Sequence, residues 1–112
     1  MFNHEINPYP VTDKVTFRNV DKTITLTVRS DGTALVTGLK HVYDRLSSVK
    51  EDTTDEEKKE VARLFADTIF GSEQGKRLTA FYGGDAISVI TACGMYFRGR
   101  LGKKITKAQK RK

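Results

Sequence analysis

The sequence predicts a small α+β domain: an N-terminal β-hairpin, about four helices, and a basic C-terminal tail that we expect to be flexible. Three observations point to this fold class. Residues 14–29 alternate apolar and polar side chains with a period of two, as in half-buried strands. Beyond Gly32 the apolar period changes to that of amphipathic helices. From Arg98 onward the chain contains no acidic side chain.

The hairpin is predicted from two runs of β-branched residues. Ile24, Leu26 and Val28 share one face of the second strand, and threonines alternate with them on the other face. Residues 19–22 supply the turn between the strands. Two strands are too few to be stable alone. We therefore expect the hairpin to lie on the helices or to pair through its edge with another copy, giving a homo-oligomer.

The first two helices are predicted at 33–50 and 55–70. Ser30 or Asp31 is placed to cap the first. Thr54 and Glu57 have the spacing of a capping box at the start of the second. Gly71 follows as the residue expected to end that helix in a left-handed conformation.

The third helix is predicted at about 73–82, with Ser72 as its cap, and ends before a glycine pair. Asp85 is placed to cap the fourth, whose apolar residues reach Leu101. We divide the chain into a leader (1–12), a single α+β domain (13–102) and the basic tail (103–112). Pro8 and Pro10 restrict the leader to extended conformations.

Charge is concentrated in the last fifteen residues, which we call the basic segment. Its basic side chains are Arg98, Arg100, Lys103, Lys104, Lys107, Lys110, Arg111 and Lys112. The whole chain has 20 basic and 14 acidic side chains, so removing these eight leaves 12 against 14, a net charge of −2. The protein is thus a nearly neutral body with a cationic arm.

The sequence contains no recognisable catalytic or metal-binding pattern. His4 and His41 have no further ligand at metal-binding spacing. Cys93 falls on an apolar helical stripe, where cysteine usually serves as a small hydrophobic side chain. We expect no enzymatic activity, no cofactor and no metal. One cysteine and no run of about 18 apolar residues predict a soluble intracellular protein that does not enter a membrane.

Two features are candidates for partner binding. Phe81 and Tyr82 stand together at a helix end, where the pair is either simply buried or an exposed protein–protein anchor. The basic segment has three interpretations: a solubilising tail, a nucleic-acid-binding tail, or a segment that binds an acidic protein surface. Nucleic-acid binding is the less favoured of these, because the aromatic residues are not interleaved with the basic ones.

From Phe65 onward the chain resembles small prophage proteins of Gram-positive bacteria, of the phage tail assembly chaperone type. The matching features are Phe70-Gly71, Leu78 with Phe81-Tyr82, Ala92-Cys93-Gly94, and Lys103 to Lys110. The resemblance covers about half of the chain well. The strand from Ile24 to Arg29 is a weaker match.

The resemblance implies a non-enzymatic protein that binds the tape-measure protein, the major tail-tube protein or both during tail assembly. It also implies a location in the host bacterial cytoplasm and absence from the mature virion. Two alternatives remain: a small nucleic-acid-binding protein that uses the basic tail, and a minor structural tail component. The partner-binding residues expected under the first reading are Phe81, Tyr82 and the eight basic side chains of the basic segment.

Overall fold

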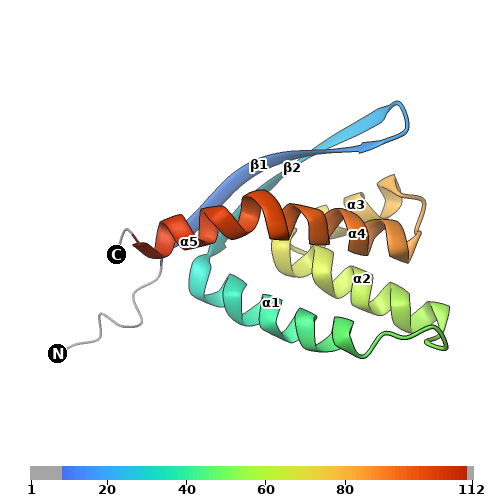
Figure 1. The fold of residues 1–112 in the computed structure, drawn as a ribbon. Helices are drawn as coiled ribbons and strands as arrows, with labels where there is room; N and C mark the ends of the chain where they lie inside the picture. Colours follow the sequence, from blue (N-terminus) through green and yellow to red (C-terminus); the bar gives the residue numbers. More distant parts are fainter. Residues whose placement is uncertain (1–8, 111–112) are drawn as a thin grey trace.

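The computed structural model describes residues 9–110, and of Lys110 the backbone alone. An antiparallel hairpin lies along one side of a group of packed helices (Figure 1). The predicted α+β class, with its N-terminal hairpin followed by four helical segments, is confirmed. The fourth segment is the longest and runs beside the hairpin.

The hairpin consists of β1 (Pro10–Asn19) and β2 (Lys22–Asp31), paired from Pro10↔Asp31 to Asn19↔Lys22. The turn lies at the predicted place. Its first residue, Val20, has φ 59°, a left-handed conformation that is rare for a β-branched residue. Residues 10–12, assigned to the leader from the sequence, are instead part of β1. Tyr9, also assigned to the leader, is buried in the core, and residues 1–8 lie outside the described residues.

The predicted inner face of β2 is confirmed. Leu26 and Val28 are fully buried, and Ile24 packs partly buried against the core. Across the hairpin, Val11 and Phe17 of β1 are buried on the same face. These apolar residues fix the register, because a shift by one residue would turn them all to solvent.

Helices α1 (Gly32–Ser47) and α2 (Asp55–Phe70) have the predicted N-terminal caps. Asp31 accepts a hydrogen bond from the Thr33 N–H at 3.1 Å, and Thr54 accepts one from the Glu57 N–H at 3.2 Å. The bounds of α2 are those predicted, whereas α1 ends three residues before position 50. Gly71 ends α2 as predicted, but with φ 86° and ψ 161°, so its φ is positive while the residue is not in the left-handed helical conformation that was expected.

Helix α3 (Ser72–Phe81) begins one residue earlier than predicted. Ser72 is its first residue and not its cap. The cap position belongs to Gly71, and no side chain caps this helix end. Helix α4 (Ala86–Tyr96) is capped by Asp85 as predicted, through a 3.2 Å hydrogen bond from the Ser88 N–H.

The chain stays helical beyond α4. A π-helical turn, η2 (Phe97–Leu101), leads directly into α5 (Gly102–Lys110), and α4 and α5 are drawn as one continuous helix in Figure 1. The boundary predicted between domain and tail at residue 103 therefore falls inside a helix. Leu101 and Ile105 are buried and extend the apolar face across it. The expected flexibility of the tail stays a prediction.

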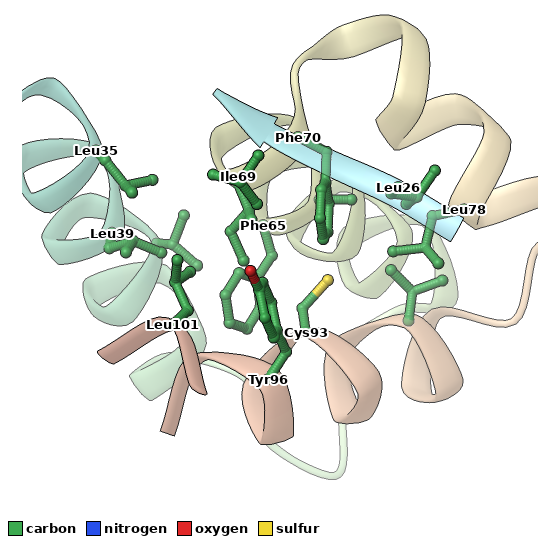
Figure 2. Close-up of a cluster of buried hydrophobic side chains, with 14 of the residues drawn as sticks. Leu26, Leu35, Leu39, Phe65, Ile69, Phe70, Leu78, Cys93, Tyr96 and Leu101 are labelled. Atoms are coloured by element: carbon green, nitrogen blue, oxygen red, sulfur yellow. The ribbon is translucent and has the colours of Figure 1, made fainter. Parts of the chain in front are cut away.

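The core lies between the hairpin and the helices. Figure 2 shows Leu26 of β2, Phe70 of α2 and Leu78 of α3 on one side of a cluster that Tyr96 and Leu101 of the last helix complete. The ring of Phe17 meets Phe70 and Tyr96 edge-on at centroid distances of 5.7 and 6.1 Å. Phe70 and Tyr96 stack at 5.9 Å. This aromatic contact joins β1, α2 and α4, and orients the last helix against the hairpin.

Candidate functional site

The basic side chains of the last helix fall into two groups. Arg98, Lys103 and Lys107 are exposed and form no ion pair within residues 9–110. Arg100 and Lys104 lie on the side that faces β1 and approach one buried carboxylate. The remaining members of the basic segment have no described side chains. Lys110 is described only in its backbone, and Arg111 and Lys112 lie outside the described residues.

Asp13 of β1 is that carboxylate, and only 1% of its side chain is exposed. The Arg100 guanidinium reaches Asp13 Oδ1 through Nη2 at 2.8 Å and Nε at 3.0 Å. Lys104 Nζ lies 3.8 Å from the same oxygen. The Tyr96 hydroxyl donates a 2.7 Å hydrogen bond to Oδ2. Asp13 thus fastens β1 to three successive turns of the last helix.

Burial alone raises the pKa of the Asp13 carboxyl, because a charge is poorly solvated there. Hydrogen bonds from Tyr96, Arg100 and the Lys14 backbone, together with the charge of Arg100, outweigh burial and lower that pKa below its usual value. Burial is also the main reason that the pKa of Tyr96 is raised, and the Asp13 charge adds to it. Asp13 is therefore ionised and Tyr96 neutral at neutral pH.

The outer edge of β1 is open at two positions, Thr12 and Thr16; of the other outward groups, the Lys14 N–H donates a hydrogen bond to Asp13 and the Arg18 C=O accepts one from Tyr82. Asn19 and Lys22 flank a two-residue turn and form a hydrogen-bonded pair, so the pairs alternate from there along the hairpin. Thr12 and Thr16 consequently point their backbone N–H and C=O groups away from β2. Within the described part of the chain, these groups make no hydrogen bond.

The outer edge of β2 is closed at the corresponding level. Gln74 of α3 accepts a 2.9 Å hydrogen bond from the Thr27 N–H and donates a 2.7 Å one to the Thr27 C=O. Its amide also donates to the Phe70 C=O at 3.0 Å. One side chain thus satisfies the outward backbone groups of Thr27 as a neighbouring strand would. The two edges of the hairpin are therefore not equivalent.

An open groove of about 520 Å³ runs between the start of β1 and the last helix. Pro10 and Thr12 line its strand side, and basic residues of the helix line the other. Those basic residues are Arg100, Lys103, Lys104 and Lys107. The groove therefore joins an open strand edge to a cationic wall, a combination suited to an extended segment of negative charge.

Phe81 and Tyr82 lie at the opposite end of the hairpin, away from this groove. Both are half-buried, and their rings meet edge-on at a centroid distance of 5.1 Å. The Tyr82 hydroxyl donates to the Arg18 C=O at 3.2 Å, and the Phe81 C=O accepts from the Asn19 side chain at 3.0 Å. The pair holds the hairpin end against α3, so it does not form one surface with the basic residues. Its predicted role in partner binding stays a prediction.

Other kinds of site receive no support from the described residues. No group of three or more histidine, cysteine, aspartate or glutamate side chains within residues 9–110 is placed to hold a metal ion. No helix in the same range is long and apolar enough to cross a membrane. Cys93 is fully buried, as predicted, and burial raises its pKa to about 12. Its thiol is thus neutral and shielded.

Sequence reasoning missed Asp13 and the groove. The available signal was that Asp13 continues the inward-facing series of Val11, Val15 and Phe17. A carboxylate at such a position needs a cationic or hydroxyl partner from another element.

No family model, curated protein or solved structure matches this chain.

Proposed function

We propose that this protein is a non-enzymatic tail assembly chaperone that binds the tape-measure protein, the major tail-tube protein or both during phage tail morphogenesis. It acts in the host bacterial cytoplasm and leaves before the virion matures. The observation that carries the proposal is the groove beside the strand edge, where Lys103 and Lys107 of the last helix form no ion pair within residues 9–110. The resemblance of the C-terminal half to prophage proteins of this type supplies the identity of the partner.

The geometry favours a protein partner because it offers two kinds of contact together. Exposed cations on a packed helix attract an acidic protein surface over several ångströms and set the orientation in which the partner docks. Unpaired backbone groups of a strand edge then offer directional hydrogen bonds to another polypeptide. Arg100 and Lys104 contribute less free charge than the sequence suggests, because both are drawn toward Asp13.

The alternative of nucleic-acid binding rests on the same cations. Lys103 and Lys107 also line a second open hollow with Arg98 and Thr106. Such a surface can neutralise phosphates, and its binding would weaken steeply with salt. A minor structural tail component is the other alternative, and it differs from a chaperone in remaining with the finished particle.

The test is recovery of partners from cells in which the prophage has been induced. A tagged copy of the chain is purified at moderate salt after nuclease treatment, and the bound proteins are identified by mass spectrometry. We expect tape-measure or tail-tube protein in the eluate and none of the tagged chain in purified particles. Loss of all partners after nuclease would support the nucleic-acid alternative, and presence in particles would support the structural one.

A further inference from the structure

We propose that the outer edge of β1, with the groove beside it, is a docking site for an extended acidic segment of a partner protein, which adds to the hairpin as a third strand. The inference rests on the proposed function only in taking the partner to be a protein. It adds the mode of binding and the chemistry of the bound segment.

The two strand edges differ in whether their outward backbone groups near the groove are satisfied. β2 has its outward groups at Thr27 occupied by Gln74, whereas β1 leaves those of Thr12 and Thr16 without a hydrogen bond among the described residues. Thr12, Lys14 and Thr16 are all exposed. A strand laid against this edge would satisfy backbone groups that otherwise depend on water.

The groove lies beside the part of the β1 edge that contains Thr12. A strand paired with β1 near Thr12 would lie between that edge and the last helix, because Thr12 lines the groove with Lys103 and Lys107. Side chains of a strand alternate between two faces. One set of side chains of the added strand would point to the lysines of the groove. The other set would lie on the solvent face of the hairpin, beside Lys14 and Arg18.

The charge of the groove decides between an acidic partner and a second copy of this chain. Symmetric pairing of two β1 edges would place the same basic residues of both copies together, because such an interface uses one patch twice. Like charges brought together at an interface oppose association. Asp13, which contacts Arg100 and Lys104 of the groove, is already neutralised by Arg100. An acidic segment meets these cations without that repulsion.

The edge also has features that limit indiscriminate pairing. Pro10 stands at an outward-facing position, where its missing N–H costs no bond within the hairpin. Lys14 and Arg18 place charge on the solvent face of the strand. Such an edge discourages apolar strands and admits those of opposite charge.

The probe is a synthetic ten-residue peptide with glutamate at every second position and threonine or valine between. A peptide of the same sequence with N-methylated backbone amides keeps the charge but cannot form the ladder. Both are titrated into the full chain labelled with ¹⁵N, and amide hydrogen exchange is followed by NMR. We expect the first peptide, at saturation, to slow exchange at Thr12 and Thr16 by at least about tenfold, and the methylated peptide to leave it unchanged.

Matched variants separate strand pairing from charge attraction. Thr12→Pro removes one outward N–H without removing a bond of the hairpin, and Thr12→Ala keeps that N–H. We expect the proline variant to weaken peptide binding by about tenfold and the alanine variant by less than about twofold. If the proline variant does not fold, the methylated peptide alone tests strand pairing. The double variant Lys103→Glu with Lys107→Glu tests the contribution of charge. Its charge-matched control is Lys50→Glu with Lys59→Glu, both exposed and outside the lining of the groove.

Several results would overturn the inference. Equal binding of the methylated peptide would show that charge attraction alone holds the peptide. Chemical-shift changes confined to α5, without slower amide exchange at Thr12 and Thr16, would show the same. Concentration-dependent self-association that protects the same amides would assign the edge to a second copy. Failure of the peptide test while tail proteins are still recovered from cells would remove this binding mode and leave the proposed function standing. Peptide binding without recovery of tail proteins would support this binding mode and contradict the proposed function.

Discussion

Replacement of Asp13 by alanine should destabilise the protein more than any change of an exposed aspartate. The variant leaves the buried Tyr96 hydroxyl without its 2.7 Å acceptor. A buried polar group without a partner costs about 1–3 kcal/mol. It also breaks the contacts to Arg100 and Lys104, whose side chains are 61% and 43% exposed. Because both cations can rehydrate, these contacts add at most about 1 kcal/mol.

The expected loss is therefore about 1–4 kcal/mol in the free energy of unfolding, out of the roughly 5–15 kcal/mol typical of small domains. For a chain of this length, this corresponds to a fall of about 4–16 °C in Tm. The assay is urea unfolding at pH 7 followed by circular dichroism. Asp52→Ala is the matched control, because Asp52 is exposed and its side chain forms no hydrogen bond or ion pair within residues 9–110; it should change stability by less than about 0.5 kcal/mol.

A double-mutant cycle with Tyr96→Phe isolates the central hydrogen bond. We expect the two changes to be coupled by about 0.5–3 kcal/mol, since each removes one partner of the same contact. Additive effects, or a loss below about 0.5 kcal/mol for Asp13→Ala alone, would refute the reasoning that this carboxylate fastens β1 to the last helix.

Four further predictions concern stability and reactivity. Because its folded pKa is lowered, the ionised Asp13 carboxyl contributes stability that is present above the usual carboxyl pKa of 3.8 and lost as the pH falls through the folded value. The stability gap between wild type and Asp13→Asn in urea unfolding should therefore narrow from pH 7 to pH 2, and a constant gap would contradict this. Val20→Gly should stabilise the hairpin by about 1 kcal/mol, since glycine adopts positive φ without strain; Val20→Ala, which keeps a Cβ, is the control. Gln74→Glu should destabilise more than Gln74→Met, because a carboxylate oxygen would face the Thr27 C=O; the reverse order in thermal melts would be inconsistent with the amide bridge. Cys93 should react with iodoacetamide only as fast as the protein unfolds, and rapid labelling of the native protein would show that the thiol is accessible.

The elements with strong local signals were predictable from the sequence. The bounds of α2 follow from a capping residue, Thr54, and a terminating glycine, Gly71, which act within one helical turn. Leu26 and Val28 identify the inner face of β2 because their alternation is unbroken. In each case neighbouring residues alone decide the structure.

The start of β1 and the end of the last helix depended on tertiary contacts. Pro10 suggested a leader, but at an outward-facing strand position its ring removes no hydrogen bond of the ladder. The charge of residues 103–110 suggested a flexible tail, but Leu101 and Ile105 bury one side of it against the core. The many basic residues of this segment drew attention away from Leu101 and Ile105, which are apolar and four residues apart, as on one face of a helix.

The candidate site was only half predictable, for the same reason. The cations were evident in the sequence, whereas their division into two groups depends on Asp13, some ninety residues earlier in the chain. The open edge of β1 follows from strand register and from the bridge that Gln74 makes to β2. Contacts between distant parts of the chain leave little trace in local patterns.

The most direct test of the proposed function compares wild type with the double variant Lys103→Glu, Lys107→Glu in induced, nuclease-treated cells at moderate salt. Both chains carry the same tag, and tape-measure and tail-tube proteins in the eluates are quantified by mass spectrometry. We expect recovery by wild type and a loss of at least about tenfold in the variant, with unchanged thermal stability. Recovery of neither tail protein by wild type would contradict the chaperone function, and equal recovery by both chains would contradict the role of the last helix.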